Sequence, residues 1–516
     1  MTGTGPVPAV LIREQGERMW LDDRQIGELA SLDDGKTGWP VPTQMISNGE
    51  FLPIAQTEQQ KKVEHELGQL TATHSRKLGV SRRDFLRSGA GMSAAFLAMN
   101  TVFGSYFNDA DAAALDPDVA EALRARLRDQ PIIDVQLHFV RDDYKKTIVL
   151  ALGEYAKNWN PVLAREGVSI DRYKFDHFLK EVYFDSDTRI GLVSAAPSEQ
   201  GDNVIVGNAG LEQARRLVNE AAGSRRMLSH SVIAPGQKGW LEEIDKAIEL
   251  YKPDGWKGYT LGDPFENSQY PWRLDDEKLM YPAYEKMMKS GIRTVCIHKG
   301  LLPDDYQRTM THWRHAMVDD VGKAAKDWPG LNFVIYHSGF RNFLSSPDPV
   351  LAEFDKTGQI DWVTQLAEVP AKFGVSNVFA ELGTTFGSCA VTHPKLAAAV
   401  LGTLIKGMGA DHVVWGTDSV WYGSPQWQIE AFRRIEIPPA MQKAHGYAAL
   451  GAADGKLKSA ILAGNAAGLF NLHKEMAEQP WRHDLLAQAK AEYQAAGGKP
   501  SNQYYGFIRK SSGMLS

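Results

Sequence analysis

The chain has 516 residues, of which 43% are hydrophobic and 23% charged, and its formal net charge at pH 7 is -6. These totals are typical of a globular protein with one large domain and extensions, and they exclude a chain that is disordered throughout. Because there is no long basic run, we expect no nucleic-acid partner. The two cysteines, Cys296 and Cys389, allow at most one disulfide bond.

Residues 1–80 are expected to form an N-terminal arm that contains one helix. Residues 1–56 show no sustained hydrophobic period. Thr57 and Gln60 then form the pattern of a capping box, in which each side chain satisfies a free backbone N–H at the start of a helix. An apolar stripe follows, and the helix should end near Gly79.

Residues 81–115 resemble a twin-arginine export signal. A run of Ser-Arg-Arg-Asp-Phe-Leu-Arg starts at Ser81, an uncharged stretch covers 88–107, and small residues typical of a cleavage site stand at 110–112. The resemblance predicts a periplasmic protein that meets the twin-arginine export machinery. The alternative is an apolar helix capped by Ser81 and Asp84, in a cytoplasmic protein.

Residues 125–472 alternate between short β-branched runs and helical patterns. One of the helical patterns ends on Gly291, as a helix C-cap should. Eight parallel strands that alternate with helices predict an α/β fold of the (β/α)8 TIM-barrel type. Residues 473–516 are expected to add a C-terminal helical tail. The eight runs are 132–138, 190–195, 228–234, 256–259, 294–298, 333–337, 378–382 and 413–418.

Several predicted strands end on a polar residue, and in a barrel these ends converge around the active site. Alternate residues of a strand share a face, so Asp134, Gln136 and His138 should point the same way. A single strand-end histidine is more often structural, but the recurrence favours a metal site with His138, His298 and Asp418 as ligands. The strand-end residues are Gln136, His138, Lys257, His298, His337, Glu381 and Asp418.

The ordered motifs of residues 131–472 resemble the amidohydrolase superfamily, in the branch of the aminocarboxymuconate-semialdehyde decarboxylase relatives. They are "IIDVQLHF", "VCIHKG", "VIYHSG", "VVWGTDS" and "ILAGNAAGLFNL". The resemblance implies metal ligation by His138, His298 and Asp418, and a catalytic or supporting role for His337. Gln136 stands in the place of the first ligand, where its neutral amide oxygen is a poorer donor to zinc than imidazole or carboxylate.

We expect one divalent metal ion per chain, Zn2+ with Mn2+ as the alternative. Lys257 stands where binuclear relatives carry a carboxylated lysine, but a role in neutralising a substrate carboxylate or pairing with Glu381 is favoured here. Asp418 would take a proton from the metal-activated water. His337 would orient the nucleophile or protonate the leaving group.

The predicted function is a metal-dependent hydrolase of a C–N or C–O bond in a small, aromatic or apolar molecule. One alternative is a non-oxidative decarboxylase on the same scaffold. Another is a metal-free binding barrel, which the unusual glutamine and the long extensions motivate. A homo-oligomer is expected. Substrate contacts are predicted for Lys257, Glu381, Trp256, Tyr259 and Trp421.

Overall fold

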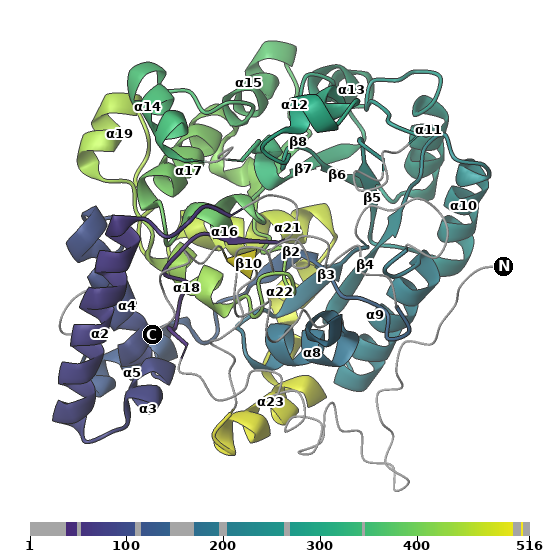
Figure 1. Ribbon diagram of the computed structural model, residues 1–516. Helices are drawn as coiled ribbons and strands as arrows, with labels where there is room; N and C mark the ends of the chain where they lie inside the picture. Colours follow the sequence, from purple (N-terminus) through teal and green to yellow (C-terminus); the bar gives the residue numbers. More distant parts are fainter. Residues whose placement is uncertain are drawn as a thin grey trace, which may run out of the picture.

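The computed structural model describes residues 38–48, 53–108, 115–144, 170–195, 204–262, 269–342, 346–498 and 507–508. Its centre is a parallel sheet of eight strands in the order β2 to β9. Figure 1 labels β2 to β8 around the middle of the molecule. The sheet closes into a barrel because the N–H of Val135 donates to the carbonyl of Trp415 and that of His138 to Ser419. The predicted TIM barrel is confirmed. The strands are β2 (Ile133–Leu137), β3 (Ile190–Val193), β4 (Met227–Val232), β5 (Gly255–Tyr259), β6 (Thr294–His298), β7 (Asn332–Tyr336), β8 (Val378–Glu381) and β9 (Val413–Val414).

Helices follow the strands and surround the barrel (Figure 1). Around the barrel they are α8 (Phe175–Leu179), α9 (Asn208–Ala222), α10 (Trp240–Lys246), α11 (Tyr281–Ser290), α12 (Tyr306–Thr309), α13 (Val321–Asp327), α14 (Asp348–Thr357), α15 (Val363–Phe373), α16 (Thr385–Cys389) and α17 (Pro394–Met408). After β9 come α18 (Gln426–Arg434), α19 (Pro439–His445), α20 (Lys456–Ser459), α21 (Asn465–Leu469), α22 (His473–Glu478) and α23 (Leu485–Ala495).

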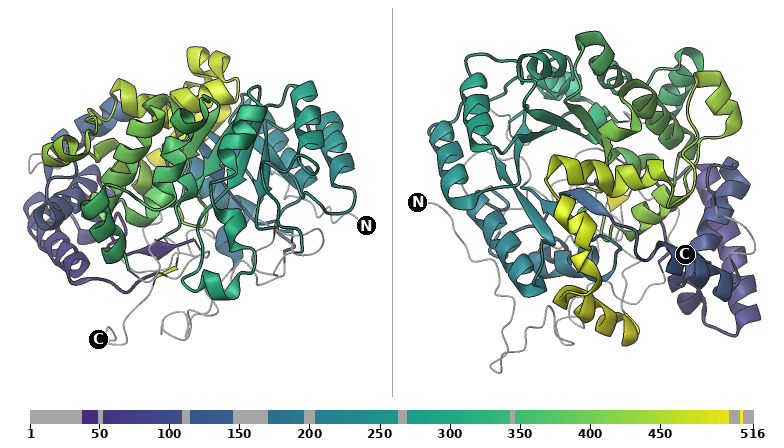
Figure 2. Two further views of the ribbon diagram at one scale, coloured as in Figure 1. Left: turned by 90° about the horizontal axis from the view of Figure 1, so that it is seen from above. Right: turned by 180° about the vertical axis from the view of Figure 1, so that it is seen from behind.

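The barrel interior is a packed apolar core at its N-terminal end. Ile133, Leu228, Val334 and Val414 meet there, and Phe470, directly after α21, closes this end. The polar strand ends lie at the opposite end, which we call the barrel mouth. Figure 2 shows the yellow-green helices after β9 at one end of the barrel and the short purple β1 (Ile46–Ser47) and yellow β10 (Phe507–Ile508) at the other.

The helices before the barrel stand together on one of its sides (Figure 1). They are α2 (Glu58–Leu78), α3 (Arg82–Arg87), α4 (Gly89–Phe103) and α5 (Pro117–Leu127). Both bonds of the predicted capping box between Thr57 and Gln60 are present, and α2 ends on Gly79 at φ 68°.

The stretch that resembles an export signal forms α3 and α4. Phe96 and Met99 of α4 are fully buried, and the guanidinium of Arg434 on α18 lies over the Phe96 ring. Among the described residues, no helix is both long and apolar enough to cross a membrane. The cleavage-like residues 110–112 lie outside the described residues. Cys296 and Cys389 are both buried and free.

Candidate active site

Five predicted residues meet at the barrel mouth. Oδ1 of Asp418 lies 3.1 Å from Nε2 of His138 and 2.9 Å from Nε2 of Gln136. Nε2 of His337 lies 3.1 Å from Nδ1 of His298 and 3.4 Å from the same Gln136 amide nitrogen. Gln136 therefore joins the His138–Asp418 pair to the two other histidines. None of the five residues is more than 6% exposed.

The backbone that carries these side chains is locally strained. His337, Thr384 and Asp418 have φ values of 61°, 58° and 60°, in the left-handed region that residues other than glycine rarely adopt. Such residues cluster at functional sites, where the surrounding structure holds them in place. Gly416 is needed for space, because a Cβ there would lie 1.8 Å from Oε1 of Glu381.

Backbone carbonyls fix the tautomers of two histidines. Nδ1 of His138 donates to the carbonyl of Ser194 over 2.9 Å, so in the neutral ring Nε2 presents a lone pair to Asp418. Nδ1 of His337 donates to the carbonyl of Gly383 over 2.8 Å in the same way. Burial lowers the pKa of His337 to about 4, although Asp418 counteracts it. This ring is therefore neutral at pH 7, and its Nε2 is a hydrogen-bond acceptor.

Asp418 is an ionised carboxylate with both oxygens engaged. Burial works to raise its pKa, but the hydrogen bond and positive charge of a protonated His138 and the hydrogen bond from Thr384 outweigh burial, so the pKa lies below its ordinary value. Oδ2 accepts from the Thr384 hydroxyl over 2.6 Å and from the Asn48 amide over 2.8 Å. Asn48 and Thr384 were not predicted from the sequence.

Two facing acceptor atoms and one buried amide oxygen give the site part of the donor set that a divalent ion needs. Nε2 of His138 and Oδ1 of Asp418 are two acceptors that face each other, and Oε1 of Gln136 is buried without a hydrogen-bond partner. Two acceptors in contact need a positive charge between them, either a proton on the imidazole or a metal ion. A third ligand is not assembled, since within the described parts of the chain no three His, Cys, Asp or Glu side chains form a metal cluster.

Glu381 and Lys257 lie beneath the mouth. The two carboxylate oxygens of Glu381 accept from the backbone N–H groups of His337 and Gly383 over 3.0 and 2.5 Å, and burial raises its pKa to about 8. Lys257 is fully buried, and its Nζ lies 3.4 Å from the centre of the Tyr336 ring. Its positive charge lowers the pKa values of His298 and His337, after the larger effect of burial.

The three predicted aromatic residues lie in different places. Tyr259 stacks on His298 with ring centres 5.0 Å apart, and Trp421 stacks on His138 at 5.7 Å. Trp256 lies on the other face of β5, in the core between strands and helices, where its Nε1 donates to the carbonyl of Ile292. Its indole therefore faces away from the mouth.

Asp134 does not share the site face that strand alternation predicts. The register of β2 is irregular between Asp134 and Leu137, and the Asp134 carboxylate accepts from the hydroxyl and the N–H of Thr417. Burial raises its pKa to about 7. Asp134 therefore holds the turn before Asp418 instead of facing the mouth.

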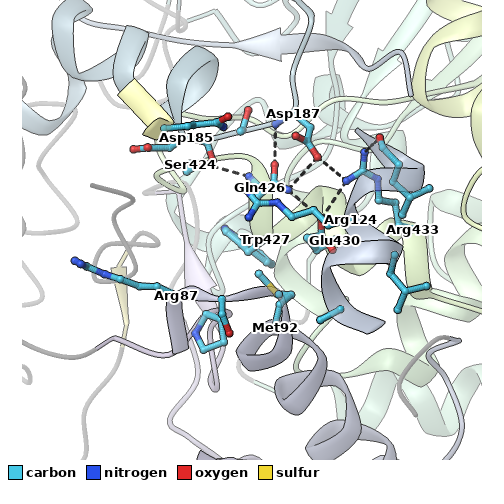
Figure 3. A pocket seen from close by; sticks show the side chains of 18 of the residues that line it. Arg87, Met92, Arg124, Asp185, Asp187, Ser424, Gln426, Trp427, Glu430 and Arg433 are labelled. Carbon is cyan, nitrogen blue, oxygen red and sulfur yellow. Dashed lines mark hydrogen bonds and ion pairs between the residues drawn. The ribbon is translucent and has the colours of Figure 1, made fainter. Parts of the chain in front are cut away.

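A hollow lies between α3, α5, α18 and α23, and none of the predicted site residues lines it. Figure 3 shows one cluster of its charged groups: Nη1 of Arg433 contacts Asp187 over 2.6 Å and Glu430 over 3.0 Å. Gln426 bonds to both carboxylates. Arg433, Asp187, Glu430 and Gln426 therefore satisfy each other's charges and hydrogen bonds. The hollow lies where the N-terminal helices pack against the barrel.

A family model described as amidohydrolase matches residues 133–472, which include every barrel residue described above. The chain belongs to the amidohydrolase family. A search of curated proteins finds no match.

Several solved structures resemble the barrel. An uncharacterised TIM-barrel protein from Bordetella bronchiseptica is 14% identical, with a TM-score of 0.43 over 66% of this chain and 98% of its own. A dihydroxybenzoic acid decarboxylase from Polaromonas with bound manganese and the inhibitor 2-nitroresorcinol is 15% identical, with a TM-score of 0.40 over 66% and 97%. A 4-oxalomesaconate hydratase from Rhodopseudomonas palustris is 14% identical, with a TM-score of 0.35 over 71% and 99%.

Proposed function

We propose that this amidohydrolase-family protein is a metal-dependent hydrolase that uses water to cleave a C–N or C–O bond of a small molecule. The observation that carries the proposal is the buried His138–Asp418 pair, whose facing acceptor atoms lie 3.1 Å apart. His138, Asp418 and His298 would hold one divalent ion, Zn2+ with Mn2+ as the alternative. When bound, such an ion supplies Lewis acidity that lowers the pKa of water and polarises a carbonyl.

The side chains of the site divide the remaining work. Asp418 is ionised and can accept the proton of the attacking water and later return it to the leaving group. His337 is neutral, and its Nε2 accepts from Nδ1 of His298 over 3.1 Å, so His337 can orient the His298 ring, which supports an orienting role over an acid role. Tyr259 and Trp421 flank the histidines with aromatic faces suited to an apolar or aromatic substrate.

A decarboxylase is the second candidate, and the buried Lys257 favours it. A cation with no exposure beneath the mouth attracts an anionic substrate, and decarboxylation starts from a carboxylate. A hydrolase of neutral amides or esters has less need of such a charge.

Product analysis separates the two candidates. The full-length protein, supplied with Zn2+ or Mn2+, is incubated with a panel of amides, esters and hydroxybenzoates. We expect release of an amine or alcohol together with an acid. The His138→Ala variant should lose more than about 100-fold in activity, which is more than the loss of a group that only orients a metal ligand causes. The matched control is His412→Ala, which removes a histidine bonded to the carbonyl of Ser376 far from the mouth. Carbon dioxide release without hydrolysis would assign the decarboxylase.

A further inference from the structure

Oδ2 of Asp418 accepts a hydrogen bond from a residue that lies outside the barrel sequence. Nδ2 of Asn48 donates to Oδ2 of Asp418 over 2.8 Å and lies 3.3 Å from the hydroxyl of Thr384. The two partners are 370 positions apart in the chain, and Asn48 precedes the matched family region at 133–472.

The segment that carries Asn48 packs against the rest of the protein. We call residues 38–48 the mouth segment. Its Val41, Met45 and Ile46 are buried, and Nε1 of Trp39 donates to Oε1 of Glu64 on α2 over 3.1 Å. Residues 46 and 47 form β1, which pairs antiparallel with β10 near the other end of the chain. The two-stranded sheet of β1 and β10 therefore lies at the mouth end of the barrel, as Figures 1 and 2 show.

The contact suits a positioning role. A carboxylate has about four acceptor sites, so its orientation depends on where its donors stand. Asn48 and Thr384 occupy Oδ2, which leaves Oδ1 facing His138 and Gln136. An amide donor achieves this without adding a charge beside the buried carboxylate. With 8% exposure, Asn48 also helps to keep water from Asp418.

We propose that the mouth segment completes the active site and that Asn48 positions the Asp418 carboxylate through Oδ2. The proposal rests on the proposed function, in which Asp418 is the reactive group and a metal ligand. It adds a residue that lies outside the barrel and that the motifs of residues 131–472 do not contain.

The first experiment measures the contact without metal. Urea unfolding of the full-length chain in chelator is followed for the wild type, Asn48→Ala, Asp418→Ala and the double variant. If the two side chains interact, Asn48→Ala shifts the unfolding midpoint less in the Asp418→Ala chain, where the partner is already absent. Equal shifts in both backgrounds would overturn the proposal.

The second experiment measures the consequence by calorimetric titration of chelator-treated, full-length protein with Zn2+ alone. We expect Asn48→Ala to weaken zinc binding by about 10–100-fold, as loss of a group that orients a ligand does. Asn48→Leu keeps the side-chain shape without the donor and must give the same shift. Trp39→Phe removes another bond of the mouth segment and should bind zinc like the wild type.

Two results of the zinc titration would overturn the proposal. Unchanged zinc affinity in both Asn48 variants would make the contact merely structural and overturn the proposal. An equal loss in Trp39→Phe would show that displacement of the mouth segment, and not the Asn48 donor, is responsible, which also overturns it. A wild type that binds neither Zn2+ nor Mn2+ would refute the proposed function, while the unfolding cycle would still decide whether Asn48 holds Asp418.

Discussion

Replacing Gln136 by glutamate should turn the site into one whose stability depends on pH and on metal. Nε2 of Gln136 lies 2.9 Å from Oδ1 of Asp418, so the change places two carboxylates in contact. Their repulsion would be about 6 kcal/mol at an effective dielectric constant of about 20. Protonation is less costly: with an ordinary glutamate pKa of about 4.3, holding a proton at pH 7 costs about 4 kcal/mol. The new carboxyl should therefore be protonated in the metal-free protein.

The sign of the pH dependence follows from that proton. A carboxyl whose pKa is raised on folding binds more protons in the folded state, so the free energy of unfolding falls as pH rises. The metal-free Gln136→Glu variant should lose about 1 kcal/mol at pH 5 and about 4 kcal/mol at pH 7 relative to the wild type. Zn2+ between the two carboxylates should replace the proton and restore stability, by about 2.7 kcal/mol at 100 times its Kd.

Urea unfolding followed by circular dichroism, at pH 5 and pH 7 with chelator or with Zn2+, measures each of these terms. Gln136→Met is the matched control, because it has similar volume and no charge: it should show no pH dependence, and because it gains no carboxylate, zinc should stabilise it no more than it stabilises the wild type. A Gln136→Glu chain whose stability loss is the same at both pH values would refute the assigned contact with Asp418. A loss that zinc does not reduce would refute the metal site.

Three further predictions concern stability and location. Asp484→Ala removes the carboxylate that pairs with the buried Arg226 and should cost about 3–5 kcal/mol of unfolding free energy at pH 7. Burial works to raise the pKa of Asp484, but Arg226 outweighs burial and lowers it. The stabilisation should therefore be present above about pH 4 and disappear as acid protonates the carboxyl in the folded protein. Gly416→Ala should destabilise by about 1–3 kcal/mol in urea unfolding, since its methyl group would overlap a carboxylate oxygen of the site, whereas Gly468→Ala meets nothing within 4 Å and should not. A reporter fused to residues 1–115 should reach the periplasm only with Arg82 and Arg83 intact. An unchanged location of the reporter after replacement of both by lysine would favour the helix-cap interpretation.

The barrel could be predicted because strands and helices alternate regularly along the chain. All eight predicted strands are present, most of them within one or two residues. The last is the exception: it was expected over 413–418 but ends at Val414, because the chain leaves the regular ladder before it turns at Asp418. Local periodicity contains no information about such a turn.

The site could be predicted only in part. Gln136, His138, His298, His337 and Asp418 were identifiable because the barrel brings the ends of its strands together. Asp134 was misplaced because a register irregularity in β2 breaks the simple alternation. No signal in the sequence points from the irregular N-terminal arm to the mouth, so the contact of its asparagine became visible only in three dimensions.

The metal content of the full-length protein, purified without added metal and measured by elemental analysis, tests the central claim most directly. The account predicts about one divalent ion per chain in the wild type, and loss of most of it in Asp418→Ala and His298→Ala. A wild type without a divalent ion, which also takes up none from solution, would contradict the account and favour a metal-free binding barrel. A content near two ions per chain would contradict the mononuclear site.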